Sequence, residues 1–299
     1  MVSLPPRAVL VTRRSDYENL LAVHATREQA RFFLRTRGQD IDDLQRQHEA
    51  FLAVVHDVSV SLPRDWRTAR VGRDDLDRFL FAPEDVVLAI GQDGLVANLA
   101  KYLAGQPVLG VNPAPQVNEG VLVPLTAADV PKLAPAAAEG AASLERRAMV
   151  RAWLDDGQEL RALNEIFVGH HSHQSARYLI TFGDKTELQS SSGVIASTGT
   201  GVTGWARSIM TATRKAVKLE PTDAAFVFFV REAWPSVATG ASITAGRLRA
   251  GQSLAITSNM NDGGVIFADG IEQDRLGFGW GRSVRVEVAP TTLNLVRRD

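Results

Sequence analysis

The chain has 299 residues, of which 45% are hydrophobic and 22% charged, a composition typical of a globular protein with one large domain or two ordinary ones. The formal net charge of −1 is not that of a polycationic protein that binds nucleic acid, so we expect no nucleic-acid partner. The absence of cysteine excludes disulfides, thiolate zinc sites and a cysteine nucleophile. The first residues lack a secretory apolar stretch, and no apolar run nears the roughly 18 residues of a membrane helix. We therefore expect a soluble cytoplasmic protein with no membrane partner.

The first part of the chain predicts a parallel βαβ unit. Residues 7–12 form a run rich in valine and leucine, which is typical of a buried strand. Residues 26–55 space apolar positions three and four apart among good helix formers, which predicts one or two amphipathic helices. Residues 85–90, 95–105 and 107–112 follow as strand, helix and strand, and such a connection joins parallel strands.

A change of composition marks the expected domain boundary. Alanine and proline dominate residues 127–140, which we expect to form a helix, and we place the boundary near residue 125. Beyond it, short apolar segments alternate with Gly, Asp and Asn, which predicts antiparallel strands. The expected architecture is an α/β domain over 1–125, which residues 285–299 can complete, and a β-rich domain over 126–284.

The first candidate site is the turn Gly91-Gln92-Asp93-Gly94, between a predicted strand and a predicted helix. Glycines at such a turn let the backbone approach a phosphate, and the helix N-terminus offers free N–H groups to it. A carboxylate repels phosphate unless it holds a metal ion or accepts a proton from a substrate hydroxyl. The alternative is a tight turn that only starts a helix.

The second candidate is the polar pair Asn164 and Glu165, at the entry to an apolar strand. Side chains of neighbouring strand residues point to opposite faces of a sheet. We therefore expect either that one of the two side chains is exposed or that both residues precede the regular pairing of the strand. A carboxamide and a carboxylate at a strand end can bind a base edge or ribose hydroxyls. Two ordinary surface residues are the alternative.

The third candidate is a loop of small residues that follows a short predicted strand and precedes a predicted helix. Hydroxyl side chains alternating with glycine can hold polar ligand atoms. We expect a closely packed loop, because proline and charge are absent from it; a flexible loop is the alternative. Its hydroxyl, glycine and tryptophan residues are Thr198, Gly199, Thr200, Gly201, Thr203, Gly204 and Trp205.

Two other groups of residues are weaker candidates. His170, His171 and His173 resemble a metal cluster, but neighbouring strand residues point apart and no cysteine is available, so we expect solvated histidines and no metal site. Trp205 can stack on a base, although tryptophans in β domains more often pack in the core or at interfaces.

Together and in this order, the three motifs resemble the NAD kinase family. That family has a Gly-Gly-Asp-Gly turn after a strand, an Asn-Glu pair, and an Asp-Gly stretch leading into a Thr-Pro-Thr-Gly-Ser-Thr-Ala-Tyr loop, which correspond to residues 91–94, 164–165 and 192–205. Residues 107–125 are similar to a Gly-[Ile/Val]-Asn-x-x-Pro-x-x-x-x-Gly stretch of the mitochondrial-type branch. The resemblance covers most of residues 85–270 and leaves 26–80 unmatched.

The resemblance implies an α/β nucleotide-binding domain, a β-rich domain and an active site in the cleft. It implies transfer of the γ-phosphoryl group of ATP, with Mg²⁺, to the adenosine ribose 2′-hydroxyl of NAD, in a homodimer or homotetramer. Asp93 would accept or orient the hydroxyl proton, as the catalytic residue. The residues implied to line the nucleotide are Gly91, Gln92, Gly94, Asn164, Glu165, Thr198, Thr200, Gly201, Thr203, Trp205 and Ser208.

The chain departs from the family pattern at several positions, of which Gln92 and Ser192 are the most informative. Gln92 replaces a glycine, and its side chain would impede nucleotide binding if the position required a positive φ or a close approach of phosphate. Ser192 stands where the family has aspartate. Two alternatives remain open: a kinase for another hydroxyl-bearing small molecule, such as a sugar or lipid, and an inactive nucleotide-binding regulatory relative.

Overall fold

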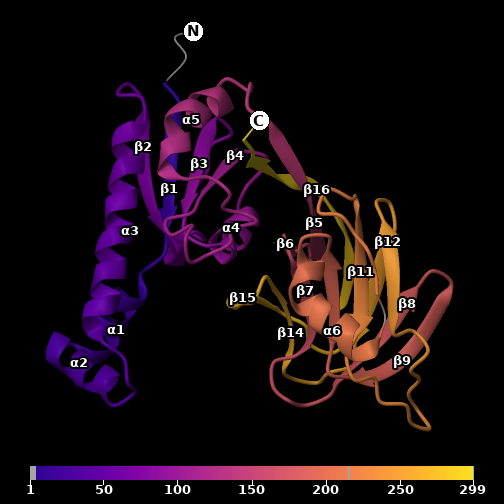
Figure 1. The fold of residues 1–299 in the computed structure, drawn as a ribbon. Coiled ribbons are helices and arrows are strands. Elements are labelled where there is room, and N and C mark those ends of the chain that lie inside the picture. Colours follow the sequence, from indigo (N-terminus) through magenta and orange to yellow (C-terminus); the bar gives the residue numbers. More distant parts are fainter. Residues whose placement is uncertain (1–4, 215, 299) are drawn as a thin grey trace. The chain divides into compact units, whose positions relative to one another are not determined.

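The computed structural model of the protein describes residues 5–214 and 216–298. Residues 1–4 at the chain start, Lys215 in the helix predicted after Trp205, and Asp299 in the predicted completing segment lie outside the described residues. The chain divides into two compact units, Met1–Glu145 with Asn294–Asp299, and Arg146–Leu293 (Figure 1). The first is mixed α/β and the second is built mainly of antiparallel strands, which confirms the expected fold class.

A parallel sheet forms the centre of the first unit, with strand order β2-β1-β3-β4. Its strands are β1 (Arg7–Thr12), β2 (Arg67–Gly72), β3 (Asp85–Ile90) and β4 (Pro107–Val111). Every residue of β3 is buried, as the apolar run over 86–90 predicts, and the buried Asp85 at its start pairs with Arg7 at 2.6 Å. Strand β2 was not predicted, because it is an edge strand rich in arginine in which only Val71 is buried.

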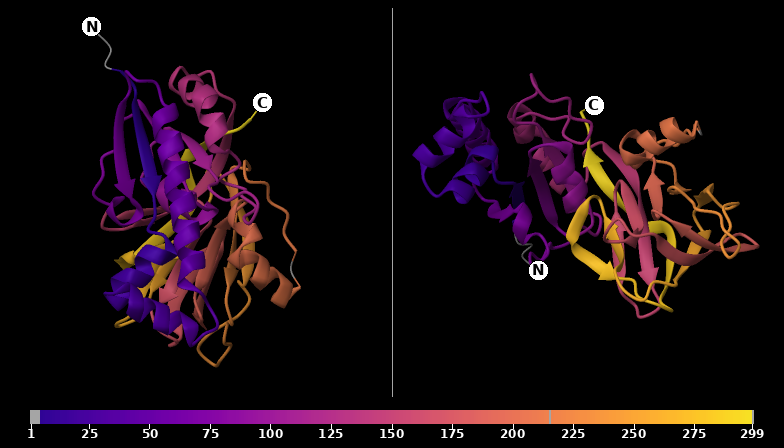
Figure 2. Two further views of the ribbon diagram at one scale, coloured as in Figure 1. Left: turned by 60° about the vertical axis from the view of Figure 1, so that its left-hand side comes forward. Right: turned by 90° about the horizontal axis from the view of Figure 1, so that it is seen from below.

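In the described part of the first unit, five α-helices accompany this sheet. They are α1 (Asp16–His24), α2 (Arg27–Arg35), α3 (Ile41–Ser61), α4 (Asp93–Ala100) and α5 (Val130–Ala138), with short 3₁₀ turns η1 (Arg73–Asp75) and η2 (Ala127–Asp129). The prediction of one or two helices over 26–55 is confirmed by α2 and α3, which Thr26 and Asp40 cap, whereas α1, capped by Ser15, was not predicted. Helices α1 and α2 pack at the N-terminal end of α3, beyond the strands (Figures 1 and 2).

Helix α5 belongs to the first unit. Its buried residues Val130, Leu133 and Ala134 lie in the same apolar core as Leu109 of β4. The compact first unit therefore continues to Glu145, whereas we had placed the boundary near residue 125. Helical periodicity predicts α5 itself, but only packing shows which core its apolar face covers.

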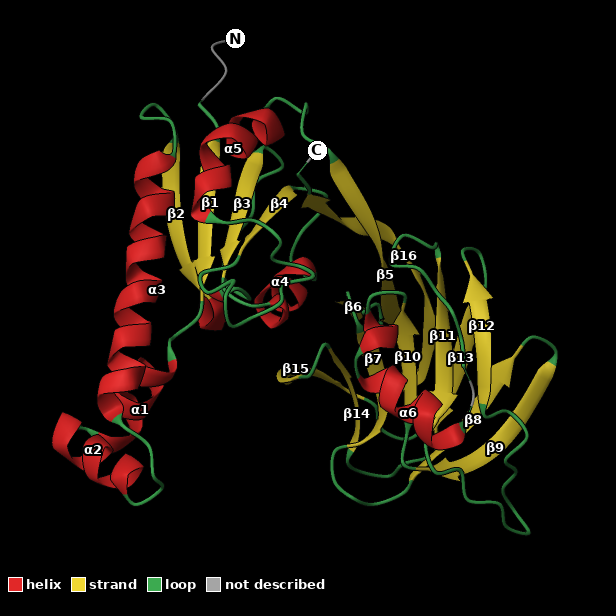
Figure 3. Cartoon of the chain, viewed as in Figure 1, coloured by secondary structure: helices red, strands yellow, loops and turns green. Residues whose placement is uncertain are grey.

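Two sheets pack face to face in the second unit, with a shared core that includes Tyr178 and Ile256 of one sheet and Phe226 and Phe228 of the other. One sheet has the order β12-β11-β10-β7-β14-β15, and the other contains β16-β13-β8-β9 with β5 and β6 (Figure 3). The strands are β5 (Leu144–Leu154), β6 (Glu159–Ala162), β7 (Glu165–His170), β8 (Ala176–Phe182), β9 (Lys185–Ser191), β10 (Val194–Thr198), β11 (Ala225–Val230), β12 (Ala245–Arg249), β13 (Ser253–Ser258), β14 (Gly264–Ala268), β15 (Ile271–Gly277) and β16 (Ser283–Val296), with turn η3 (Gly201–Thr203) and helix α6 (Trp205–Thr213).

Some strands of the second unit lack the apolar pattern by which a strand can be recognised in a sequence. Strands β9 and β15 are polar along most of their length, because each lies at the edge of its sheet. Strand β16 continues past the second unit, and its residues Asn294 and Leu295 pair in parallel with β4 of the first. Among the described residues, none of the helices combines the length and hydropathy needed to cross a bilayer.

Candidate functional site

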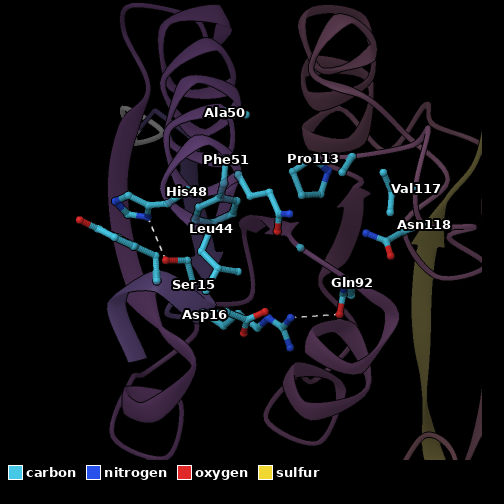
Figure 4. Close-up of a pocket in the computed structure, with 15 residues that line it drawn as sticks. Ser15, Asp16, Leu44, His48, Ala50, Phe51, Gln92, Pro113, Val117 and Asn118 are labelled. Carbon is cyan, nitrogen blue, oxygen red and sulfur yellow. Dashed lines mark hydrogen bonds between the residues drawn. The ribbon is translucent and has the colours of Figure 1, made fainter. Parts of the chain in front are cut away.

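A cavity of about 280 Å³ lies in the first unit, next to the residues that follow β1, β3 and β4 (Figure 4). Its apolar wall includes Phe51 and Pro113, and its polar groups include Arg13, His48 and Gln92. Ligands of parallel α/β sheets bind outside the carboxyl ends of the strands, and ligand pockets combine apolar walls with a few polar groups. The position and lining of this cavity are those of a small-molecule site.

The turn after β3 has ordinary backbone geometry at Gln92. This residue caps α4 with φ −108° and is therefore outside the left-handed region. Of the two conditions under which Gln92 would impede nucleotide binding, a positive φ is therefore not met. Instead, the Gln92 amide oxygen accepts a hydrogen bond of 3.0 Å from the Arg13 guanidinium across the cavity (Figure 4).

The two glycines of this turn differ in what surrounds them. A Cβ on Gly91 would lie 3.0 Å from a methyl carbon of Leu95, which is tight. A Cβ on Gly94 would meet nothing within 4 Å. The fold therefore leaves the Cβ position of Gly94 open.

Asp93 is the first residue of α4, and backbone amides orient its carboxylate. Val121 N donates to one oxygen at 3.2 Å and Leu122 N to the other at 2.9 Å. This loop approaches because residue 110 is glycine, where a Cβ would lie 1.9 Å from the Leu122 carbonyl oxygen. Each carboxylate oxygen has two acceptor positions, so Asp93 can accept a further hydrogen bond at each oxygen.

The loop after β4 is held by Asn112, which is buried. Its amide nitrogen donates to the Asn118 carbonyl at 2.8 Å, and its oxygen accepts from Ala114 N at 3.0 Å. Ala114 and Asn118 also line the cavity. The side chain of Asn112 thus fixes one wall of the site without lining it.

The Asn164-Glu165 pair lies in the second unit, where Glu165 begins β7. The carboxylate of Asp269, which follows β14, accepts hydrogen bonds from three successive backbone amides: Leu163 at 2.9 Å, Asn164 at 2.7 Å and Glu165 at 3.2 Å. Asp269 itself has a positive φ of 51°. Its carboxylate therefore fixes the backbone at the polar pair, an interaction that sequence reasoning missed.

Glu165 differs from Asp93 in its surroundings. Burial, followed by the charge of the nearby Asp269 carboxylate, raises the pKa of Glu165 to about 7. Within the described part of the chain, no hydrogen bond forms on the Glu165 carboxylate. A half-buried carboxyl group that titrates near neutrality is a candidate for contact with a ligand.

The second and third motifs meet in the second unit. Thr198 N donates to the Asn164 carbonyl at 2.9 Å, and the Thr198 hydroxyl donates to the Leu163 carbonyl at 2.5 Å. The same hydroxyl accepts from Thr200 N and Gly201 N at 3.1 and 3.3 Å. The loop is closely packed, as predicted, and Thr198 joins it to the polar pair.

Gly199 and Gly201 lie where the neighbouring backbone leaves no room for a side chain. A Cβ on Gly201 would lie 2.1 Å from the Asn164 carbonyl oxygen, and one on Gly199 would lie 1.9 Å from the Glu220 carbonyl oxygen. Neither position can hold a larger residue without backbone movement. Buried Arg147 adds a hydrogen bond of 3.3 Å from its guanidinium to the Thr200 hydroxyl.

The remaining predicted residues of the loop lie at its outer side. Thr203 and Ser208 are exposed. The Trp205 ring stacks on Phe167 with centroids 6.0 Å apart and an interplanar angle of 14°, and Arg231 lies 5.2 Å from its centroid. The indole is therefore engaged in packing between α6 and the sheet, as tryptophans of β domains usually are.

Metal-binding residues do not gather within the described residues, where no group of three His, Asp or Glu side chains has the arrangement of a metal site. His171 and His173 are exposed and His170 is half-buried. Mg²⁺ in phosphoryl-transfer enzymes is held by one or two carboxylates together with substrate phosphates. The single oriented carboxylate of Asp93 fits that kind of site.

Sequence reasoning also missed the residues that follow β1. Arg13 and Ser15 line the cavity, and the Ser15 hydroxyl is 2.9 Å from His48 Nδ1 of α3. Arg13 could have been predicted from the sequence, because it follows a predicted parallel strand just as Gly91 does. His48 could not have been predicted, since only the packing of α3 brings it to the cavity.

Neither a protein-family model nor a curated protein sequence matches the chain. Solved structures do match it. The yeast NADH kinase complexed with NADH superposes with a TM-score of 0.61 at 15% identity, covering 99% of this chain and 84% of the kinase. An NAD kinase from Archaeoglobus fulgidus in complex with ATP superposes with a TM-score of 0.59 at 16% identity, covering 98% of this chain and 94% of the kinase. The chain therefore has the two-domain fold of the NAD kinases.

Proposed function

We propose that the protein is a phosphotransferase that moves the γ-phosphoryl group of ATP to the adenosine ribose 2′-hydroxyl of NAD or of its reduced form. The observation that carries the proposal is the carboxylate of Asp93, which two backbone amides orient beside a turn whose Gly94 is open. The fold supports it, because solved structures with this fold include an NADH kinase complexed with NADH and an NAD kinase in complex with ATP.

In this proposal the first unit is the nucleotide-binding domain. Phosphoryl transfer requires a positioned hydroxyl and neutralised phosphate charge rather than covalent chemistry by the protein. Asp93 accepts the hydrogen bond of the acceptor hydroxyl and orients it. Gly91 and Gly94 allow the phosphates close to the backbone, and Arg13 supplies positive charge. Bound with the phosphates, Mg²⁺ supplies the rest of the neutralisation.

The second unit contributes recognition of the dinucleotide in this proposal. Asn164 and Glu165 contact it, with their backbone held by Asp269. With a pKa of about 7, Glu165 can donate or accept a hydrogen bond to a hydroxyl at neutral pH. We propose further nucleotide contacts for Thr200, Gly201, Thr203 and Ser208, while Thr198 holds the loop and Trp205 supports it by packing.

The test is a coupled assay of the purified full chain. ATP with Mg²⁺ is supplied together with NAD or NADH, and formation of NADP or NADPH is measured. Asp93→Asn keeps an acceptor for one backbone amide but removes the charge, and we expect kcat to fall by about 10²- to 10⁴-fold. Asp57→Asn is the matched control, because Asp57 is an exposed carboxylate on α3 that lies outside the cavity.

Each outcome decides the proposal. Product formation that Asp93→Asn abolishes and Asp57→Asn preserves supports it, and the better acceptor identifies the substrate. Binding of ATP without product from either dinucleotide points to another hydroxyl acceptor, such as a sugar or lipid. Failure of ATP and both dinucleotides to bind in calorimetry would overturn the proposal.

A further inference from the structure

Glu165 and Asp269 form a pair of carboxyl groups at one corner of the second unit, where β7 begins and β14 has ended. Two hydrogen bonds join the residues. Asp269 N donates to the Glu165 carbonyl at 3.0 Å, and Glu165 N donates to the Asp269 carboxylate at 3.2 Å. The backbone therefore holds two acidic side chains next to each other within a single unit.

The hydrogen-bond donors of this corner are divided unequally between the two carboxyl groups. The Asp269 carboxylate accepts from the amides of Leu163, Asn164 and Glu165. The described part of the chain offers no hydrogen bond to the carboxyl group of Glu165. Donors favour the charged form of a carboxyl group, whereas burial beside a like charge favours the neutral form. In this pair Asp269 is therefore suited to carry the charge, and Glu165 to carry the proton.

The other groups around Glu165 do not change this division. Ser197 of β10 lies opposite Glu165 in the sheet and is uncharged. Arg147 donates to a threonine hydroxyl of the loop after β10, and Arg231 lies over an indole ring. Burial and the charge of Asp269 are the two causes that raise the pKa of Glu165 to about 7. Within the described residues, the protonation of Glu165 thus depends on Asp269.

A protonated Glu165 suits the ligand of the proposed function better than an ionised one. A dinucleotide is an anion, because two phosphates join its halves, and like charges repel strongly where water is excluded. An ionised carboxylate only accepts hydrogen bonds, whereas a protonated carboxyl group also donates one. The phosphate and ribose oxygens of the ligand are acceptors for that donor.

We propose that Asp269 is a positioning residue that keeps Glu165 protonated at neutral pH, so that Glu165 donates a hydrogen bond to an oxygen of the dinucleotide. This inference rests on the proposed function, since it concerns the part of the site that recognises the dinucleotide. Asp269 acts without touching the ligand. Above neutral pH, Glu165 has lost its proton, so binding takes one proton up from solution and the affinity falls.

Calorimetry of the full chain with NAD or NADH tests the role of Glu165. For the wild type, the dissociation constant should rise at least about tenfold between about pH 6 and about pH 8.5, because only the protonated fraction binds. Glu165→Gln keeps an uncharged donor, so its dissociation constant should be the same at both pH values. Glu272→Gln, on the exposed surface of β15, should keep the pH dependence of the wild type.

Asp269→Asn tests the role of the neighbouring charge. Asparagine tolerates the positive φ of 51° at this position and keeps an acceptor oxygen for the amides, but it carries no charge. NMR titration of the ligand-free chain with isotope-labelled glutamate follows Glu165, whose signal Glu165→Gln assigns. The titration midpoint of Glu165 should move from about 7 towards 4.5 in Asp269→Asn. Asp184→Asn, in the exposed turn after β8, should leave it unchanged.

The outcomes separate this inference from the proposed function. A wild-type affinity that is constant or rises with pH would overturn the inference, and so would a folded Asp269→Asn in which the midpoint of Glu165 does not move. A purely structural role of Asp269 predicts that unmoved midpoint. If Asp269→Asn does not fold, the comparison of the wild type with Glu165→Gln decides. Failure of NAD and NADH to bind at any pH would overturn the proposed function instead, together with the ligand contact inferred for Glu165.

Discussion

The two strand-to-helix junctions of this protein look alike in sequence and differ in what their glycines do. Between β3 and α4, Gly94 is open and could hold a side chain without a clash. Between β10 and α6, Gly199 and Gly201 are pressed against carbonyl oxygens of neighbouring segments. Between β10 and α6 the packing of the fold requires glycine, whereas between β3 and α4 Gly94 leaves space that the fold does not fill.

The acidic residues of the two units show the opposite contrast. Both oxygens of Asp93 receive backbone hydrogen bonds, so this carboxylate is oriented by the chain. Glu165 is oriented only through its backbone, and burial raises the pKa of its side chain to about 7. A carboxyl group held by the fold thus lies on one candidate motif, and one left available lies on another.

The largest expected effect breaks the packed junction. Gly201→Ala should lower the free energy of unfolding by about 3 kcal/mol, because its Cβ would lie 2.1 Å from the Asn164 carbonyl oxygen and force the backbone to move. Urea unfolding measures the change. Gly277→Ala in the same unit, where a Cβ meets nothing within 4 Å, should stay within about 0.5 kcal/mol. Equal stability of the two variants would show that the loop around Gly201 is not closely packed.

The next effect concerns the carboxyl group of Glu165. Its pKa is raised from 4.5 to about 7, so the folded state binds its proton more tightly than the unfolded state does. The stability that Glu165 contributes is present below pH 4.5 and lost as the pH rises through about 7.

Glu165→Gln removes this titration. The variant should match the wild type near pH 4.5 and exceed its stability by about 1 to 2 kcal/mol at pH 8, allowing for partial exposure of the side chain. Urea unfolding at the two pH values gives the result, and Glu272→Gln on the exposed surface of β15 is the control. A wild type and variant with the same pH dependence would mean that Glu165 titrates at an ordinary pKa.

A third prediction tests the open junction. Gly94→Ala should leave the free energy of unfolding within about 0.5 kcal/mol, or raise it slightly, since alanine favours a helix and meets no atom within 4 Å. If phosphates approach this turn, the same methyl group should raise KM for ATP by about tenfold. A variant with unchanged stability and unchanged kinetics would remove Gly94 from the site.

The smallest expected effect concerns Gln92. Because its φ is −108°, Gln92→Gly relieves no strain, and it loses only an exposed hydrogen bond with Arg13. We expect less than about 1 kcal/mol in stability and less than about threefold in nucleotide affinity, measured by unfolding and calorimetry. An affinity gain of tenfold or more would show that the Gln92 side chain obstructs the ligand.

Much of the fold was predictable because it follows local patterns. The buried strands of the first sheet and the turn from Gly91 to Gly94 were expected at the positions where they occur, since continuous apolar runs and glycines next to helix signals are local features. Edge strands such as β2 and β15 were missed, because an edge strand need not bury its side chains. The three-helix arm was predicted in part, because its caps are single residues that many turns also contain.

The sequence by itself determined the order of the motifs and the class of chemistry each can perform, because residue type and position in the chain are sufficient for that. Only the tertiary structure decided how the carboxylates are held. Asp93 is bound by amides 28 and 29 residues away, and Asp269 binds amides 104 to 106 residues away. Hydrogen bonds over such separations follow from how segments pack against one another, and no local pattern specifies that packing.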